Sequence, residues 1–349
     1  MNRCSQLALA VAMLALANAD VFAQQTTPSP TVQAPSATQI IRTRGARSMS
    51  RTMQAWQSAF VREHPGVKFD NRLLGSATGM AGITTGAADL AVMGRPVNAN
   101  EIIGFEWVWQ VKPLGIAVAR GSLQREGYSP SLAVLVSRHN PLQSISLAQL
   151  AQVLGCPADP GLQADWADTG VSGTWATHPL HAYVYDDQTG TGAWLMQVVQ
   201  GTKDCWNWAV VHEFFDQENK NGTTHSASEQ IGEALDHDPD GLAITTLAEV
   251  DSRVKLLPVA GAGAPIPLNA STVSDGSYPF TRNVYFYVRK PRDGPIDSLL
   301  MDFVNFVLSP QGQAIVKQTG DLLPLGREAA DAEAAKLHSA QTVKLTAKQ

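Results

Sequence analysis

The chain has 349 residues, of which 44% are hydrophobic and 16% are charged, and its formal net charge is −5. This composition suits a globular protein of about two domains with a full-sized core, and it excludes a fibrous or wholly disordered chain. The acidic balance provides no basic surface for nucleic acid, so we expect no nucleic-acid partner, and any anion site has to be local.

The first 23 residues predict a signal peptide. Arg3 supplies a positive start, residues 7–19 form an apolar segment, and Val21-Phe22-Ala23 is a small-residue cleavage site. No later stretch approaches the roughly 18 consecutive apolar residues of a membrane span. Residues 24–38 are rich in Pro, Ser, Thr and Gln and predict a flexible leader. We therefore expect a periplasmic or secreted protein without a membrane span.

Two cysteines remain after the signal peptide, Cys156 and Cys205. Export favours a disulfide between them, which would stabilise the chain by about 3–4 kcal/mol in the chain-entropy model. The alternative is two separate thiols. Their spacing matches no metal site, and we expect no metal or cofactor.

The first folded segment alternates strands and helices. We expect a strand over 39–43, then a helix whose apolar residues recur at helical spacing from Met49 to Phe60, then a strand over 67–70. A loop, a short helix and a further strand follow within 73–96. This order is typical of a parallel sheet with crossover helices, in which ligands lie beyond the carboxyl ends of the strands.

The loop at 75–79 is glycine-rich and carries two hydroxyls, Ser76 and Thr78. Glycine brings backbone N–H groups close to a ligand, and a helix beginning here leaves N–H groups unpaired and partly positive. The loop is a candidate anion site, or merely a helix cap. Ser48 occupies an equivalent place after the first strand.

A second unit of the same kind lies about a hundred residues later. After strands over 113–119 and 132–137 and a helix over 146–155, a strand over 181–185 opens into a hydroxyl-glycine loop and a helix. Its Thr189, Gly190 and Thr191 resemble the first loop chemically.

The remainder predicts structure rather than chemistry. We expect a strand over 284–288, helices over 299–307 and 311–318, and a loose helical tail over 327–349. Asp236–Gly241 resembles the start of a calcium loop, but Leu247 stands where the bidentate glutamate belongs, so we interpret it as a turn. No nucleophile lies beside a His or Asp partner in one motif, so we expect no catalytic residue and no enzyme.

The order of these motifs resembles the PstS-like phosphate-binding proteins of ABC transporters, in the type II periplasmic binding protein family. The resemblance covers residues 40–325 and rests on 45–49, 75–80, 88–96, Asn140-Pro141, 189–191, 278–282, Gly312-Gln313, Gly320 and Pro324-Leu325. It implies an α/β fold of two lobes, each a mixed sheet flanked by helices. We expect lobe 1 over 39–138 plus 278–326 and lobe 2 over 139–277.

The resemblance also implies a ligand set, with departures. The positions that match give Ser48, Met49, Ser76, Thr78, Thr189, Gly190 and Thr191 as ligand contacts. Tyr185 stands where the family has an arginine, which leaves Arg95 as the possible charge partner. Where the family has Ser-Asp or Ser-Arg after the strand, this chain has Gly94-Arg95, and the family's acceptor carboxylate is missing from its place. Unless Asp89, Asp186 or Asp187 fills in, discrimination of phosphate from sulfate is in question. We expect Asp89 to pair or cap structurally.

Two functions follow from the resemblance. The first is an exported, monomeric solute-binding protein that binds an inorganic oxyanion, phosphate foremost, and delivers it to an ABC permease. The second is an exported protein of the same fold that has lost transport and serves in binding, scaffolding or sensing, which the changes at Tyr185 and Gly94 favour.

Overall fold

The computed structural model describes residues 39–123, 128–159, 161–201, 203 and 205–341. The predicted signal peptide and leader lie outside these residues. The described chain contains two five-stranded mixed sheets. The first has the order β2-β1-β3-β14-β4, from strands β1 (Gln39–Gly45), β2 (Val67–Arg72), β3 (Leu90–Met93), β4 (Leu114–Arg120) and β14 (Asn283–Val288). β1 runs parallel to β2 and β3, and β14 is antiparallel to β3 and β4.

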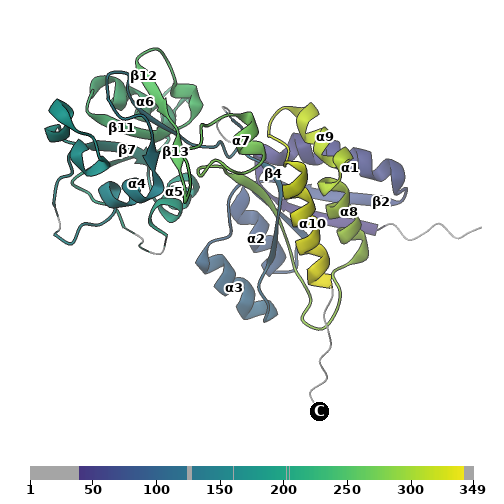
Figure 1. Ribbon diagram of the computed structural model, residues 1–349. Helices are drawn as coiled ribbons and strands as arrows, with labels where there is room; N and C mark the ends of the chain where they lie inside the picture. The colour runs from purple at the N-terminus through teal and green to yellow at the C-terminus, as the bar shows by residue number, and fades with distance from the viewer. Residues whose placement is uncertain (1–38, 124–127, 160, 202, 204, 342–349) are drawn as a thin grey trace, which may run out of the picture. The chain divides into compact units, whose positions relative to one another are not determined.

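Helices cover both faces of this first sheet, because successive side chains of a strand point to opposite faces. Leu90 and Val92 of β3 belong to one hydrophobic core, and Ala91 and Met93 belong to another. The first core is covered by α1 (Ser50–Glu63), α8 (Ser298–Leu308), α9 (Pro310–Thr319) and α10 (Arg327–Gln341), and the second by α2 (Ser76–Thr84) and α3 (Ala99–Trp109). Figure 1 shows the first group of helices apart from α2 and α3.

The second sheet has the order β12-β5-β11-β7-β8. It is built from β5 (Ala133–Ser137), β7 (His181–Tyr185), β8 (Val211–Phe214), β11 (Gly241–Thr245) and β12 (Val254–Leu257). β7 is parallel to β8 and β11, whereas β5 is antiparallel to β11 and β12. Its helices are α4 (Leu147–Leu154), α5 (Gly190–Gln200), α6 (Ala227–His237) and α7 (Ala270–Ser274).

Short elements complete the described chain. They are the strand pairs β6 (Ile145–Ser146) with β13 (Val259–Ala260) and β9 (Gln217–Glu218) with β10 (Thr224–His225), and the 3-10 helices η1 (Arg47–Met49), η2 (Trp166–Thr169), η3 (Gly173–Thr177) and η4 (Leu247–Glu249). No described helix is both long and apolar enough to cross a membrane.

Two boundaries predicted from the sequence are wrong. The strand over 132–137 was expected in lobe 1, but β5 pairs with β11 and β12 of the second sheet. The segment from 327 was expected to be a loose tail, but α10 contributes Ala330 and the fully buried Leu337 to the first core. Glu333 of α10 also accepts a hydrogen bond from the backbone N–H of Ala117 at 3.0 Å. α10 is therefore part of the first lobe.

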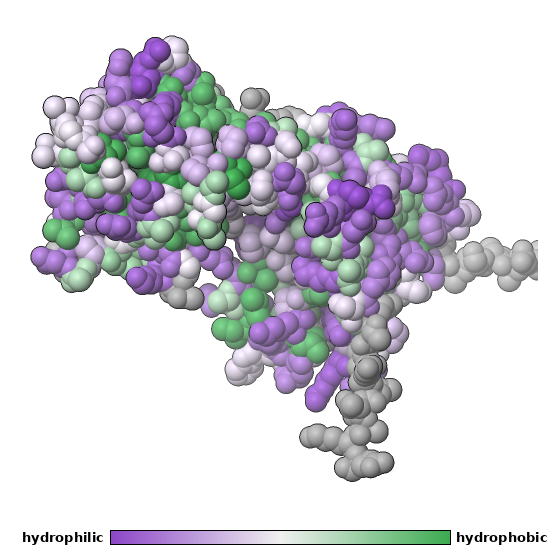
Figure 2. Space-filling view, in the orientation of Figure 1, coloured by the Kyte–Doolittle hydropathy of each residue, from purple (hydrophilic) through white to green (hydrophobic). Residues whose placement is uncertain are grey.

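Helix α3 was not predicted. Its N-terminus has a complete capping box, in which the Asn98 side chain accepts from Glu101 N and the Glu101 carboxylate accepts from Asn98 N. Three large apolar side chains of α3 are exposed, Ile103 at 52%, Trp107 at 81% and Val108 at 55%. Figure 2 shows hydrophobic surface over this helix. Because apolar residues occur all round α3, its sequence lacks the one-sided periodicity that identifies a surface helix.

The predicted disulfide between Cys156 and Cys205 is confirmed, with the two Cα atoms 5.7 Å apart. The neighbouring residues Gly155 and Trp206 pair as an isolated β-bridge. The disulfide therefore joins the segment after α4 to the segment after α5 within the second lobe.

Candidate functional site

The first predicted loop follows β1. Gly45 has φ +145°, and a Cβ atom there would lie 1.9 Å from the carbonyl oxygen of Val92, so only glycine fits. Ala46 N donates to that same oxygen at 2.8 Å, and Gly75 N donates to Gly45 O at 2.8 Å. These bonds fix the loop before Ser48 against the loop before α2, at the carboxyl ends of β1 and β3.

The two hydroxyls at the start of α2 have different roles. Ser76 Oγ accepts a hydrogen bond from Gly94 N at 3.2 Å, which leaves its own hydrogen to donate. Thr78 Oγ1 donates to Gly75 O at 2.7 Å, so this hydroxyl caps the helix. The N–H groups of Ser76 and Ala77 have no partner within the helix.

At the start of α5, too, one hydroxyl caps the helix and another can donate to a ligand. Thr189 is the N-cap, because its Oγ1 accepts from Gly192 N at 3.0 Å and donates to Asp186 O at 2.6 Å. Thr191 Oγ1 instead accepts from the guanidinium of Arg282 at 2.8 Å and keeps a hydrogen to donate. The helix again begins with unpaired N–H groups, those of Gly190 and Thr191.

Arg282, just before β14, supplies the charge at this place. The residue is 6% exposed, and its guanidinium lies 5.1 Å from the ring centre of Trp194. Its NH2 group lies 3.5 Å from Gly94 O, and its Nε has no hydrogen-bond partner. Burial lowers the pKa of Arg282 to about 10, opposed by the nearby Tyr185 and Tyr285, so it remains charged at neutral pH.

No carboxylate in the described part of the chain pairs with Arg282. A buried charge without an opposite charge is strongly destabilising. Such a cation is expected where a ligand supplies the missing anion. The sequence analysis quoted Arg282 within a family motif but assigned it no role; the signal available was a single cation at the start of a buried aromatic strand.

These groups surround one cavity of about 320 Å³. It is lined by residues from the segments after β1, β3 and β7, from the start of α2 and from the segments before β5 and β14. They are Ala46, Ser48, Ser76, Gly94, Arg95, Ser129, Pro130, Thr189, Gly190, Thr191 and Arg282. Five predicted contacts, Ser48, Ser76, Thr189, Gly190 and Thr191, therefore line it, and so does Arg95. That any of them binds a ligand stays a prediction.

Three other predicted positions do not line this cavity. The Met49 side chain is 1% exposed and lies in the core with Met53 and Trp56. The Thr78 hydroxyl is the cap described above. Tyr185 is 8% exposed, and its hydroxyl lies 3.3 Å from Thr245 Oγ1. A direct side-chain contact between these three residues and a ligand has no support in the geometry.

Arg95 lines the cavity, but its charge is already matched. Its guanidinium makes a two-pronged ion pair with Glu101, with both N–O distances 2.8 Å, and a further bond to Pro96 O at 3.0 Å. Hydrogen bonding to Glu101 raises the pKa of Arg95. Both arginines are charged, but only Arg95 is paired with a carboxylate, so Arg282 is the better candidate to pair with a bound anion.

The space next to Gly94 is filled by another residue. A Cβ atom on Gly94 would lie 2.4 Å from Ser129 Oγ, and that hydroxyl donates to Gly94 O at 2.6 Å. Ser129 therefore occupies the space of a side chain at 94. None of the described residues that line the cavity is an Asp, Glu, His or Cys.

A group of carboxylates lies close by on the second sheet. Asp186, Asp187 and Glu213 bring one oxygen each to within 4.8 Å of one another. Burial, followed by the charge of Asp187, raises the pKa of Glu213 to about 7. None of the three lines the cavity.

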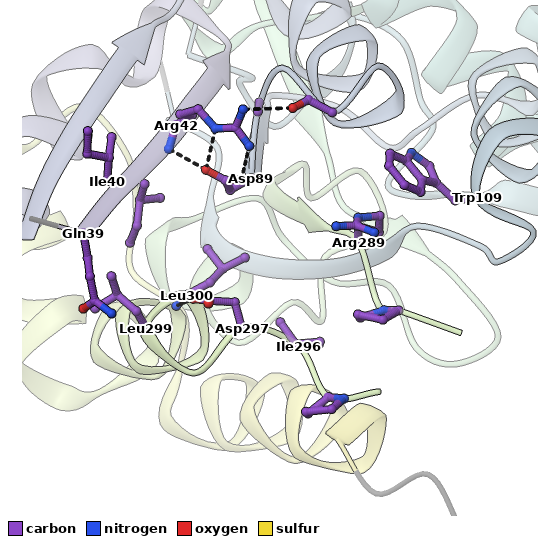
Figure 3. Close-up of a pocket in the computed structure, with 15 residues that line it drawn as sticks. Gln39, Ile40, Arg42, Asp89, Trp109, Arg289, Ile296, Asp297, Leu299 and Leu300 are labelled. Atoms are coloured by element: carbon purple, nitrogen blue, oxygen red, sulfur yellow. Dashed lines mark hydrogen bonds and ion pairs between the residues drawn. The ribbon is translucent and has the colours of Figure 1, made fainter. Parts of the chain in front are cut away.

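A larger cavity of about 670 Å³ lies at the other end of β1. Figure 3 shows Arg42 bonded to Asp89 there, with N–O distances of 2.6 Å and 3.0 Å, and Arg289 beside Trp109. The guanidinium of Arg289 lies 4.1 Å from the centre of a Trp109 ring. The Arg42 pair confirms the structural interpretation of Asp89, and this cavity contains none of the predicted ligand residues.

Comparison with known proteins identifies the family. Residues 31–311 match the model of the PBP superfamily domain. The phosphate-binding protein PstS of Pseudomonas aeruginosa is 25% identical over 292 residues, 82% of this chain and 83% of that protein. Protein SphX of Synechococcus elongatus is 23% identical over 308 residues, 85% of this chain and 81% of that protein.

Solved structures agree on the fold. PstS from Borrelia burgdorferi superposes with a TM-score of 0.54 at 15% identity, covering 82% of this chain and 99% of that one. An ABC-type phosphate transport receptor from Vibrio cholerae gives 0.51 at 16% identity, covering 82% and 100%. The family match extends over most of the chain and agrees with the two mixed sheets, so the chain belongs to the PBP superfamily and is a PstS-like protein of two α/β lobes.

Proposed function

We propose that this chain is an exported solute-binding protein that binds an inorganic oxyanion, phosphate foremost, for uptake by an ABC transporter. The observation that carries the proposal is the buried cation of Arg282, which lacks a carboxylate partner among the described residues and lies in a cavity lined by hydroxyls. The names of the PstS relatives support phosphate as the first candidate.

The geometry suits an anion with several oxygens. Two helix N-termini, α2 and α5, contribute unpaired N–H groups, and helix dipoles add partial positive charge there. The hydroxyls of Ser76 and Thr191 each retain a hydrogen, and Arg282 adds charge-assisted donors, which are stronger than neutral ones. Binding needs no reacting group, in keeping with relatives that are binding proteins by name.

The test is calorimetric titration of the ligand-stripped mature protein with phosphate. Arg282→Met removes the charge while keeping an unbranched apolar side chain. It should lower the affinity by at least about thirtyfold, because losing a buried charge partner costs about 2–5 kcal/mol. The matched control is Arg289→Met, an exposed arginine that directly follows the last residue of β14 and lines the other, larger cavity, and it should bind as the wild type does. Unchanged phosphate affinity in Arg282→Met would refute the site.

The second candidate is an exported PstS-like protein that has lost transport and serves in scaffolding or sensing. The observation that favours it is that Tyr185, in place of the family's arginine, is buried beside Thr245, while Arg95 is neutralised by Glu101. It predicts that the folded wild type releases no heat with phosphate or sulfate. A gene neighbourhood without a permease would also favour this candidate.

Two further expectations follow if the protein is exported and takes part in transport. Cleavage of the signal peptide should leave a mature protein beginning at Gln24, which N-terminal sequencing of the exported chain would reveal. We expect the mature protein to be a monomer on size-exclusion chromatography and to dock on a permease.

A further inference from the structure

A second cavity of about 270 Å³ adjoins the cavity described above. Three residues, Arg95, Thr189 and Gly190, line both cavities and form the border between them. Beyond this border the second cavity is lined by residues of the segment after β3 and of α5, which include Pro96, Val97, Asn98, Ala193, Trp194 and Gln197. Sites for organic ligands span about 300–1,000 Å³, and two adjoining cavities of about 320 and 270 Å³ together fall within this range. The two cavities together are therefore large enough for a small organic ligand.

The groups suited to an anion lie in the first cavity. Ser76, Thr191 and Arg282 line the first cavity and not the second. The second cavity instead presents apolar side chains, an indole and the amides of Asn98 and Gln197. An apolar or aromatic lining with a few polar groups is typical of a site for a neutral organic group. The two cavities therefore suit a ligand with a charged end and a neutral end.

The side chains at the border are held by bonds within the chain. Glu101 and Pro96 O bind the guanidinium of Arg95. Thr189 Oγ1 is used by the cap of α5. Gly190 has no side chain, and a Cβ atom there would approach only Arg95 among the described residues, at 3.4 Å from its Cδ. Because the φ of Gly190 is not positive, its backbone does not require glycine, and what glycine provides here is space between the two cavities.

The indole of Trp194 connects the cation of the first cavity with the lining of the second. It lines the second cavity, and its ring centre lies 5.1 Å from the guanidinium of Arg282, which lines the first. Phe280 packs edge-to-face against the indole, with the ring centres 6.4 Å apart. A group attached to a phosphate that pairs with Arg282 would therefore find an aromatic surface close by, which supplies apolar contact area.

We propose that the two cavities together bind a phosphomonoester of a small polyol, with the phosphate in the first cavity and the polyol in the second. This inference rests on the proposed function, because it uses the same anion-binding groups, and it extends the ligand class from the free anion to its esters. A phosphomonoester near neutral pH carries a charge of about −1.5 to −2 and three acceptor oxygens, so it can pair with Arg282 as the free anion can.

Two amides of the second cavity can bond the hydroxyls of the polyol. The side-chain amide of Gln197 makes no hydrogen bond to the described residues. The amide of Asn98 uses only its oxygen, which accepts from Glu101 N in the cap of α3, so its NH2 group remains available to a ligand. An amide offers two donors and an acceptor, and hydroxyls can pair with either. The neutral end of the ligand therefore meets both apolar contact area and polar partners.

The first test is calorimetric titration of the ligand-stripped mature protein with phosphate, with glycerol 3-phosphate and with glycerol. We expect glycerol 3-phosphate to bind within about tenfold of phosphate, because it keeps the charge that pairs with Arg282 and gains contacts in the second cavity. Glycerol alone should release no heat, since it lacks the charged end. If phosphate binds but glycerol 3-phosphate does not, up to about 10³ times the phosphate Kd, the inference is overturned and the proposed function stands. Absence of heat with both anions overturns the two together.

A variant that fills the second cavity tests the place of the polyol. Ala193 is exposed on α5 and lines only the second of the two cavities, so Ala193→Phe should fill that cavity without touching the groups around Arg282. It should weaken glycerol 3-phosphate by at least about tenfold and leave phosphate affinity within about twofold, because a change of one small group in a pocket alters discrimination by about 10–200-fold. The matched control is Ala332→Phe, another exposed helical alanine, which lines neither cavity and should bind both ligands as the wild type does.

A second variant guards against a failure of the first to fold, which circular dichroism detects. Gln197→Trp fills the same cavity from the next turn of α5, because residues four positions apart on a helix are neighbours on its surface. It should likewise weaken glycerol 3-phosphate more than phosphate. An equal loss of affinity for both ligands in the folded variants, or an unchanged affinity for the ester, would overturn the inference, because the polyol would then not occupy the second cavity.

Discussion

The buried charge of Arg282 should make the ligand-free protein less stable than a variant without it. Burial lowers the pKa of Arg282 from its ordinary value above 12 to about 10. Because one pKa unit corresponds to about 1.4 kcal/mol, the charged form costs about 3 kcal/mol in the folded state. The sign follows from a base whose folded pKa is lowered: the cost is fully present below about pH 10 and is relieved as pH rises further.

Arg282→Met removes this cost and also removes the hydrogen bond to Thr191 and the contact with Trp194. Those two contacts are worth roughly 1–2 kcal/mol together. The variant should therefore be about 1–2 kcal/mol more stable than the wild type without ligand, because replacing a buried charge with an apolar side chain of similar size is often stabilising. Saturating anion should reverse the order, since ligand at a hundred times its Kd adds about 2.7 kcal/mol to the wild type alone.

Urea unfolding followed by circular dichroism measures both effects, with phosphate-free buffer in one arm and phosphate in the other. Arg289→Met is again the control, and its unfolding free energy should fall by no more than about 1 kcal/mol, because it loses only the exposed contact with Trp109. If Arg282→Met is less stable than the wild type by 2 kcal/mol or more without ligand, Arg282 has a structural role and the reasoning fails.

Three further predictions concern neighbouring features. Thr191→Val should weaken phosphate binding by about 1.5–3 kcal/mol with little loss of stability. Thr189→Val should instead lower the unfolding free energy by about 1 kcal/mol, because the helix cap is lost. Calorimetry measures the first effect and urea unfolding the second, and an equal effect of both variants on affinity would contradict the assignment. Replacing Cys156 and Cys205 by serine should lower the unfolding free energy by about 3–4 kcal/mol, and thiol titration of the unreduced wild type should find neither thiol free. Leu337→Ala should cost about 2–4 kcal/mol, and a loss below 0.5 kcal/mol would mean that α10 packs only loosely.

Local patterns in the sequence predicted much of the first lobe. The apolar spacing from Met49 to Phe60 predicted α1 because it matches one helix face. Met53, Trp56 and Phe60 are buried on α1, and Met49 is buried in η1 just before it. The sequence analysis assigned no helix to residues 99–109, because apolar residues there follow no one-sided spacing, and the capping box at Asn98 and Glu101 is known from the structure. Element type followed from local chemistry wherever the periodicity was one-sided.

Partner choice was not visible in the same way. β5 is an apolar strand that suits either sheet, and only its pairing with β11, more than a hundred residues away, assigns it to the second. Likewise, the sequence shows two arginines, and only three-dimensional contacts show that Arg95 meets Glu101 while Arg282 meets hydroxyls. Long-range complementarity, rather than local propensity, decides both cases.

The position of β14 in the first sheet has a consequence for when that lobe can form. β14 lies between β3 and β4, and its Asn283 pairs with Arg120 of β4. The middle of the sheet therefore cannot form until residues 163 positions after Arg120 have been synthesised. Closing so long a loop carries a large entropic cost before any contact rewards it, which slows folding. A chain leaving the ribosome therefore has β3 and β4 without their common neighbour until its last quarter appears. The lobe that begins the sequence is therefore completed last. Until β14 is synthesised, the edges of β3 and β4 are unpaired and accessible to chaperones.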